Sequence, residues 1–433
     1  MVQPSLLYLL RAGLSPRWTR HVAAAEIALM FMGSSLLTPL YGLYREAFGF
    51  SQVTLTLVYA SYVLGNLGAL LLFGRLSDQI GRKRVSLPAI GAAGVATLLF
   101  LFAHSTAWLF VARALSGLAI GLASGAATAW ITELTEGKDS ARSTVTATSA
   151  NAYGLAVGAL LSGFLAEYAP APLQLSFVVY LLMLVALAAL VALGRETVAT
   201  PVRTFGEPWL QPRVGVPRRI RSRFVPPAVM GFAAFALVGF YAALAPTVLK
   251  RDLHQTNLAL ISLVVVELFL VAAISVHATK GLSSRRAMLT SLVLLVPSVV
   301  LLVVAQAFAS MPVLLVGTTI TGICAAMGYR GSLQVVNEIA PSEKRAEVLS
   351  SYFVVCFAGN SIPVVAVGFL ASTFTPLVAT CALAAMVTLL AALALAVEVR
   401  RRPQSAAPAG WNAAAVGADG SLTSKHRSPR QRR

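Results

Sequence analysis

GRLSDQIGRKRV, residues 74–85, joins two long apolar runs, LTLVYASYVLGNLGALLLF before it and SLPAIGAAGVATLLFLF after it. Gly74 and Gly81 allow a tight turn and a close backbone approach, where a Cβ atom would clash. Asp78 suits the positive N-terminal end of a neighbouring helix, whereas Arg82, Lys83 and Arg84 can pair with acids or lipid phosphates. The alternative is that these charges mark membrane topology alone. Topology explains the cations but neither Asp78 nor the glycines.

The composition of the 433-residue chain indicates a membrane protein. It is 57% hydrophobic and 12% charged, whereas soluble domains usually contain about 25% charged residues. Apolar runs near the ~20 residues that a helix needs to cross the hydrocarbon core recur along the chain. We therefore predict twelve membrane-spanning helices, at 20–43, 51–73, 85–104, 107–131, 143–168, 173–194, 226–248, 256–277, 286–307, 310–332, 347–371 and 375–398.

Positive charge predicts the orientation of these spans. The net charge of +18 comes from cations that lie between the apolar runs and in the tails, so we expect no nucleic acid partner. With a cytoplasmic N-terminus, only Arg45, Lys250 and Arg251 fall outside, while Arg113 and Arg330 lie within spans. Cytoplasmic loops carry the excess of Lys and Arg, so we expect both termini to be cytoplasmic.

The long polar stretch 195–225 divides the chain into two sets of six spans. We predict an N-terminal six-helix bundle at 1–194, a basic cytoplasmic loop at 195–225, a C-terminal bundle at 226–398 and a disordered basic tail at 399–433. The loops TELTEGKDSAR (132–142) and NEIAPSEKRAE (337–347) occupy corresponding places, and TKGLSSRRA (279–287) is a weaker copy of residues 74–85 without its Asp. Such repeated halves are typical of transporters with a site at the membrane midplane.

Residues 74–84 resemble the signature G-x-L-S-D-x-x-G-R-R/K-x of the major facilitator superfamily (MFS), and the span count, central loop and repeats extend the resemblance across the chain. The resemblance implies an all-α membrane protein with two six-helix bundles related by a pseudo-twofold axis. It also implies that Asp78 contacts the start of span 347–371 and that Arg82 bridges Asp78 and Glu133. Such pairs would form a cytoplasmic latch between the halves, made of Gly74, Asp78, Gly81, Arg82, Lys83 and Glu133, which opens during transport.

Two glycine-rich helices carry further signals. Arg113 begins a run with Gly117, Gly121 and Gly125, and it resembles the family's arginine associated with proton coupling; the alternative is an arginine that reaches the outer interface. Gly154, Gly158 and Gly163 are similar to the motif G-x-x-x-G-P-x-x-G-G of drug:proton antiporters, but Ala159 and Ser162 replace the Pro and one Gly. Helix packing alone would produce the same glycines.

Acidic and polar residues inside spans give candidates for the transport site. Glu267 lies near the midplane and Glu26 about six residues into the first span, and intramembrane carboxyls are expensive and usually functional. Each could carry a proton or bind a cationic substrate; the alternatives are a structural hydrogen bond for Glu267 and an interfacial position for Glu26. The candidate cavity-lining residues, for which packing is an equal alternative, are Tyr41, Tyr62, Asn66, Asn151, Tyr153, Tyr241 and Asn360. Tyr41 could equally anchor the outer interface.

We predict a secondary transporter that couples protons to the export of small, largely apolar compounds. The chain has no nucleotide-binding stretch G-x-x-x-x-G-K-[ST], and we expect no cofactor or metal. Import of a sugar, organic acid or other metabolite by symport is the alternative, and a membrane receptor or enzyme is a remote one. We expect the protein to function as a monomer surrounded by membrane lipids. Abundant arginine and alanine, as in proteins from GC-rich bacterial genomes, suggest a bacterial inner membrane.

Overall fold

The computed structural model describes residues 14–74, 76–135, 140–198 and 214–400, and every regular element in these ranges is helical. The predicted tail therefore lies almost wholly outside the described residues, as does the middle of the predicted loop 195–225. The longer elements are α2 (Pro16–Ser35), α3 (Leu37–Phe48), α4 (Gln52–Phe73), α5 (Leu76–Ile80), α6 (Arg82–Leu101), α7 (Thr106–Glu133), α8 (Ser140–Tyr168), α9 (Leu175–Leu193), α10 (Arg221–Ala243), α11 (Ala245–Arg251), α12 (Leu258–Ala278), α13 (Ser284–Ala307), α14 (Met311–Ile339), α15 (Arg345–Thr373) and α16 (Pro376–Arg400). Two short 3-10 turns, Arg218–Ile220 and Ser342–Lys344, precede α10 and α15.

The described residues contain twelve helical segments that are long and apolar enough to cross a membrane, as the sequence predicted. The first segment, Pro16–Phe48, joins α2 and α3. The predicted loop 195–225 was too long at its C-terminal end, because the helix α10 already begins at Arg221. Hydropathy follows the hydrocarbon layer, so it misses the charged turns by which a helix extends beyond that layer.

The helices pack as two similar halves, which we call the N-half (14–198) and the C-half (214–400). In the N-half α2 packs on α7 and α8, α4 on α7, and α6 on α7 and α9. The C-half repeats each pair, with α10 on α14 and α15, α12 on α14, and α13 on α14 and α16. The halves meet where α8 packs on α12 and α4 packs on α15, and the pseudo-twofold relation exchanges these two interfaces. The predicted arrangement of two six-helix bundles related by a pseudo-twofold axis is confirmed.

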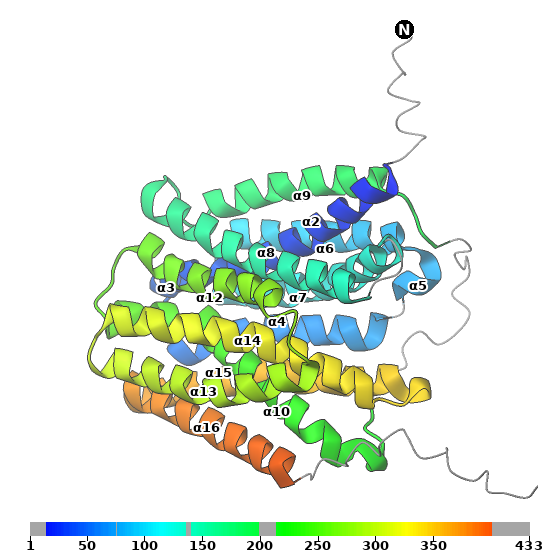
Figure 1. Ribbon diagram of the computed structural model, residues 1–433. Helices are drawn as coiled ribbons and strands as arrows, with labels where there is room; N and C mark the ends of the chain where they lie inside the picture. The colour runs from blue at the N-terminus through cyan, green and yellow to red at the C-terminus, as the bar shows by residue number, and fades with distance from the viewer. Residues whose placement is uncertain (1–13, 75, 136–139, 199–213, 401–433) are drawn as a thin grey trace, which may run out of the picture.

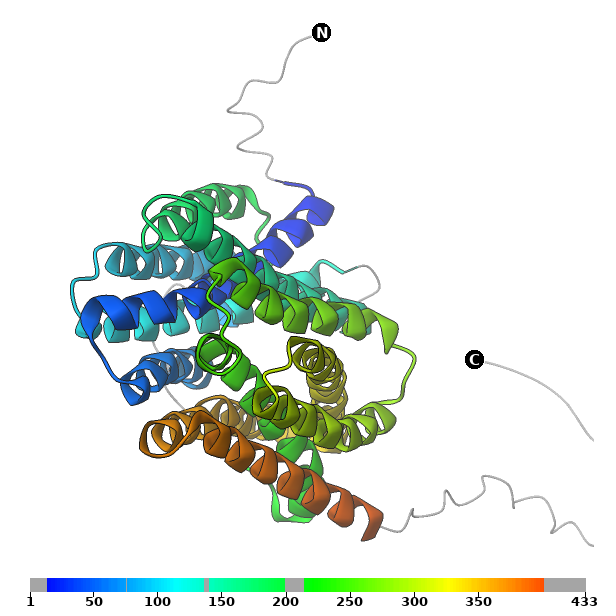
Figure 2. The same cartoon turned by 90° about the vertical axis from the view of Figure 1, so that its left-hand side faces the viewer.

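Figure 1 shows the helices running across the molecule from one end to the other, with the start of α2 and the end of α16 toward the right. We call this the inner end, because the sequence predicts it to be cytoplasmic. The opposite end, which faces the viewer in Figure 2, is the outer end. The connection 74–85 and the C-terminal ends of α7 and α9 lie together at the inner end.

Candidate functional site

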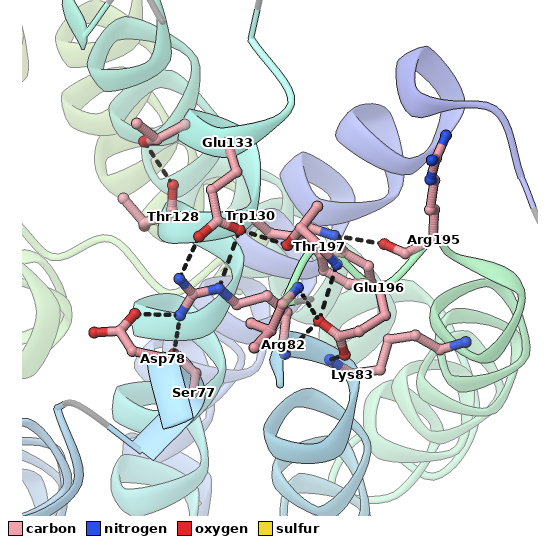
Figure 3. Close-up of polar contacts among 12 residues, drawn as sticks. Ser77, Asp78, Arg82, Lys83, Thr128, Trp130, Glu133, Arg195, Glu196 and Thr197 are labelled. Carbon is pink, nitrogen blue, oxygen red and sulfur yellow. Dashed lines mark hydrogen bonds and ion pairs between the residues drawn. The ribbon is translucent and has the colours of Figure 1, made fainter. Parts of the chain in front are cut away.

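An arginine lies between two carboxylates at the inner end of the N-half (Figure 3). Arg82 binds Glu133 through two nitrogens, Nη2 to Oε1 at 2.5 Å and Nε to Oε2 at 3.2 Å. Its Nη1 donates to Asp78 Oδ1 at 2.5 Å and to Ser77 Oγ at 2.7 Å. Arg82 is only 4% exposed, so its charge depends on these two acids. Fork-to-fork pairing of this kind is among the stronger ion pairs in proteins.

The backbone around Gly81 places Arg82 for these contacts. Gly81 has φ +112° and ψ 151°, a conformation that is essentially restricted to glycine, and it separates α5 from α6. Gly74, by contrast, has an ordinary right-handed conformation with φ −56°. Backbone conformation therefore requires glycine at Gly81. At Gly74 the reason is space, since a Cβ atom there would lie 2.6 Å from the Leu70 carbonyl oxygen.

A residue that the sequence analysis missed closes the N-terminus of α6. Gly81 has no side chain to cap this helix, and Glu196 takes that role from 114 residues further along the chain. Its Oε1 accepts from the backbone N–H of Arg82 at 2.9 Å, and its Oε2 accepts from that of Lys83 at 3.1 Å. A carboxylate at a helix N-terminus satisfies unpaired N–H groups and opposes the helix dipole.

The same cluster holds the start of the central connection. Thr197 donates its hydroxyl to Glu133 at 2.5 Å, and Trp130 donates its indole N–H to the Arg195 carbonyl at 2.9 Å. Lys83 Nζ donates to the Ala192 carbonyl at the end of α9. We call Asp78, Arg82, Glu133, Glu196 and Thr197 the inner cluster; it ties α5, α6, α7 and the segment after α9 into one unit.

The inner cluster does not cross between the halves in this structure. Among the described residues the hydrogen-bonding partner of Asp78 is Arg82, and the Asp78 side chain is 57% exposed. The contact that the family resemblance implied, between Asp78 and the start of α15, is thus not made here. The C-half holds its own inner contacts instead: Arg285 pairs with Glu398 at 2.6 Å, and Ser284 donates to Glu338 at 2.8 Å.

Arg113 lies within the N-half and is 1% exposed. Its Nε and Nη2 donate to the Tyr41 hydroxyl at 3.0 and 2.6 Å, and its Nη1 donates to the Ser34 carbonyl at 2.9 Å. No carboxylate pairs with it in the described part of the chain. The alternative of an arginine at the outer interface is therefore wrong, and so is an interfacial anchor role for Tyr41, which is 1% exposed.

The aromatic surroundings of Arg113 lead to the C-half. The guanidinium lies 5.6 Å from the ring centre of Tyr62, whose hydroxyl lies at 3.5 Å from Asn66 Nδ2. One turn before Tyr62 on the same helix, Tyr59 donates to Asn360 Oδ1 of α15 at 3.1 Å. Tyr59 is a further residue that the sequence analysis missed, and its bond joins the two halves through 301 residues of sequence separation.

The two intramembrane carboxyls have different surroundings. Glu26 is fully buried on α2, where its polar neighbour is Ser86 of α6, so the alternative of an interfacial position is wrong. Glu267 is half-buried on α12 and accepts from Thr319 of α14 at 2.6 Å, while its Oε2 has no partner in the described ranges. Beside Thr319, Thr318 donates to the Tyr241 hydroxyl at 3.0 Å, so Tyr241 is bonded within the C-half.

The three motif glycines of α8, Gly154, Gly158 and Gly163, allow close helix packing. A Cβ atom at Gly154 or Gly158 would collide with the backbone of α2, and one at Gly163 would collide with Ser262 of α12. Helix packing alone would produce these contacts, so the glycines give no separate support for proton antiport. Asn151, a turn earlier on α8, is half-buried and makes no hydrogen bond with another described side chain.

Comparison with known proteins identifies the fold. The model of the Major Facilitator Superfamily matches residues 27–280 and 228–431. The puromycin resistance protein pur8 of Streptomyces alboniger is 33% identical over 148 residues, which are 34% of this chain and 29% of that protein. The cephamycin export protein CmcT of Amycolatopsis lactamdurans is 34% identical over 141 residues, 32% of this chain and 29% of that protein. The chain thus spans less than a third of the length of these curated relatives.

Two solved structures share the architecture at low sequence identity. The human organic anion transporter MFSD10 (TETRAN) superposes with a TM-score of 0.66 at 17% identity, covering 88% of this chain and 100% of the other. The nucleoside transporter NupG, in a point-mutant form, gives a TM-score of 0.69 at 12% identity, covering 88% and 99%. At these identities the likeness supports the fold alone.

Proposed function

Because this chain belongs to the Major Facilitator Superfamily, we propose that it exports small, largely apolar compounds in exchange for protons, by alternating access between its two halves. It is a multi-pass membrane transporter of small molecules and not an enzyme. The relatives pur8 and CmcT are a resistance protein and an export protein, which favours export. We further propose a monomer in a bacterial inner membrane, with both termini and the central connection cytoplasmic.

The observation that carries proton coupling is the carboxyl of Glu267. It lies nine residues into α12, or about 14 Å along the helix axis, where a charge is expensive. One of its oxygens is fixed by Thr319 while the other has no partner among the described residues. A carboxyl held in this way can take up and release a proton without leaving its position. Arg113, which has no carboxylate beside it in the described residues, would then hold Tyr41 and the Ser34 carbonyl in position within the N-half.

Transport into inside-out membrane vesicles tests this proposal. An imposed pH gradient, acidic inside, should drive lipophilic antibiotics into vesicles that contain the protein. Glu267→Gln should abolish the pH-driven part of this uptake. Glu343→Gln is the matched control, because Glu343 is exposed at the inner end and the side chain that it bonds in the described ranges is that of its neighbour Ser342. Full pH-driven uptake by the Glu267→Gln variant would remove the proton role of this carboxyl.

Import by symport remains the second candidate, and one observation favours it. Arg113 carries a buried positive charge with no acid beside it in the described residues, which suits an anionic metabolite such as an organic acid. The same vesicles distinguish the two functions. In vesicles that are acidic inside, protons flow outward. Exchange then moves the compound inward, opposite to the proton, whereas symport moves the compound outward with the proton.

A further inference from the structure

At the outer end, the two halves are joined by an acid on one side and a helix N-terminus on the other. Glu167, in the last turn of α8, accepts from the backbone N–H of Leu258, the first residue of α12, at 2.7 Å. Beside it, Asn257 Nδ2 donates to the Tyr168 hydroxyl at 3.3 Å. Asn257 also caps its own helix, since its Oδ1 accepts from Leu260 N–H at 2.9 Å. The first turn of α12 is therefore satisfied partly by its own half and partly by the other.

A second acid of the N-half makes a similar contact nearby. Glu46 at the end of α3 pairs with Lys250 at the end of α11 at 2.6 Å, and their side chains are 56% and 41% exposed. In both contacts the N-half supplies the carboxylate, whereas the C-half supplies the positive group, an ammonium in one case and a helix N-terminus in the other. We call Glu46, Glu167, Lys250 and the first turn of α12 the outer contact.

Close packing beneath the outer contact explains how Glu167 reaches its partner. One turn further into the molecule, Gly163 of α8 lies so close to Ser262 of α12 that an added Cβ atom would overlap the serine side chain. This approach brings the end of α8 over the start of α12. Figure 2, which views the outer end, shows α8 and α12 running side by side there.

At the inner end, the N-half acid Asp78 makes no such contact with the C-half in the described residues. Its side chain is 57% exposed and bonded to Arg82 instead. We propose that Glu167, supported by the pair of Glu46 and Lys250, holds the outer end closed, and that the outer contact breaks when the halves rock and Asp78 engages the C-half. The two ends would then use the same kind of contact, an N-half carboxylate against a C-half helix N-terminus, and only one of these two contacts would be made at a time. Toward the inner end the halves are joined in this structure by Ser149 of α8 and His277 of α12, whose Oγ and Nε2 atoms are 2.9 Å apart.

Glu167, Glu46 and Lys250 are all exposed, so their partners, and not their burial, rank the members of the outer contact. A carboxylate that caps a helix shifts an equilibrium by roughly fivefold. An exposed ion pair such as Glu46 and Lys250 shifts it by about twofold or less. Loss of Glu167 should therefore open the outer end more than loss of Lys250.

Distance measurement between two spin labels at the outer end tests the proposal without any substrate. The labels would replace Ser105 and Ser310, the residues before α7 and α14, in a chain whose three cysteines are changed to alanine. Neither serine side chain caps its helix. Glu167→Ala should raise the population with a long outer distance about fivefold, and Lys250→Ala about twofold. Asp78→Asn should lower that population, because it weakens the opposing state.

Asp252→Asn is the matched control. Asp252 is also an outer-end carboxylate, but its partner Gln306 belongs to the same half, at 2.5 Å. The distance distribution of this variant should equal that of the parent protein. A shift as large as that of Glu167→Ala would overturn the proposal, because any loss of outer charge would then suffice. An unchanged distribution in Glu167→Ala would overturn it as well.

If Glu167→Ala fails to reach the membrane, an exchange of the charges of Glu46 and Lys250 tests the outer contact instead. Glu46→Lys and Lys250→Glu should each open the outer end, and the two together should restore the closed distribution. Restoration supports the outer contact, whereas a double variant that is as open as either single variant refutes the part played by this pair. Since neither experiment involves cargo or a proton gradient, both distinguish this inference from the proposed transport function.

Discussion

Replacing Gly81, the residue before α6, with alanine should destabilise the N-half more than the same replacement at a glycine inside α6. Two independent costs arise at this position. Its φ of +112° lies where side chains are strained. An alanine Cβ would also lie 2.8 Å from Glu196 Oε2, closer than real Cβ atoms approach an oxygen, so the carboxylate must move.

The size of the effect follows from these two costs. A non-glycine residue in this backbone region costs about 1–3 kcal/mol. Displacing Glu196 exposes or unpairs the N–H groups of Arg82 and Lys83, and loss of a helix cap costs about 1 kcal/mol. The total is roughly 2–4 kcal/mol, which lowers the melting temperature of a unit the size of the N-half by roughly 5–10 °C.

Thermal unfolding of the purified protein in detergent measures this change. Gly91→Ala is the matched control, because Gly91 lies in the helix that follows Gly81 and a Cβ atom there has no described neighbour within 4 Å. Gly91→Ala should therefore leave the melting temperature within a degree or two of the parent. The reasoning fails if Gly81→Ala melts with the parent protein.

A double-mutant cycle separates the two costs. If alanine at position 81 acts partly by displacing Glu196, then Glu196→Ala should cost less in the Gly81→Ala chain than in the parent chain. Strictly additive effects would show that the strain at Gly81 acts alone and that the Glu196 cap is independent of it.

Four further changes test the buried and inner-end residues. Asp78→Asn should lower transport at least tenfold with normal membrane insertion, because it removes a charge needed in the opposing state; equal transport would dismiss the latch. Arg113→Lys should also lose at least tenfold in transport, since an ammonium cannot repeat the two bonds to Tyr41, and a phenylalanine at position 41 should lower the rate by less. Glu26→Gln should leave the melting temperature unchanged or raise it, because the amide has no charge to bury and can bond Ser86 in place of the carboxyl. A drop of several degrees would mean that the acid makes bonds that an amide does not repeat.

Hydropathy alone predicted the number of spans and their middles, because a helix in the hydrocarbon must be continuously apolar. It misplaced ends that leave the membrane. The predicted span 310–332 continues as α14 to Ile339, and the predicted span 20–43 starts as α2 at Pro16. In the second case Ser15 accepts from Trp18 N–H and Pro16 follows it, a capping signal that hydropathy does not weigh.

The candidate site was predictable only where a motif gathered its residues into one stretch. Asp78 and Arg82 are one helical turn apart, so the sequence itself brings them together. Glu196 could not be found in this way, because its partners lie 113 and 114 residues away and its position after an apolar run resembles ordinary loop charge. The same holds for the bond between Tyr59 and Asn360, which depends on how the halves pack and not on any local pattern.

The fluorescence of Trp130 can report on the inner cluster, because its indole N–H donates to the Arg195 carbonyl beside that cluster. The indole is fully buried one turn before Glu133, and its N–H is held by the segment that also carries Glu196. Trp18 and Trp108 are exposed. In a chain that keeps Trp130 and has phenylalanine at the other four tryptophans, emission wavelength becomes a continuous signal of whether that segment stays docked. The protein therefore contains its own fluorophore beside the inner cluster.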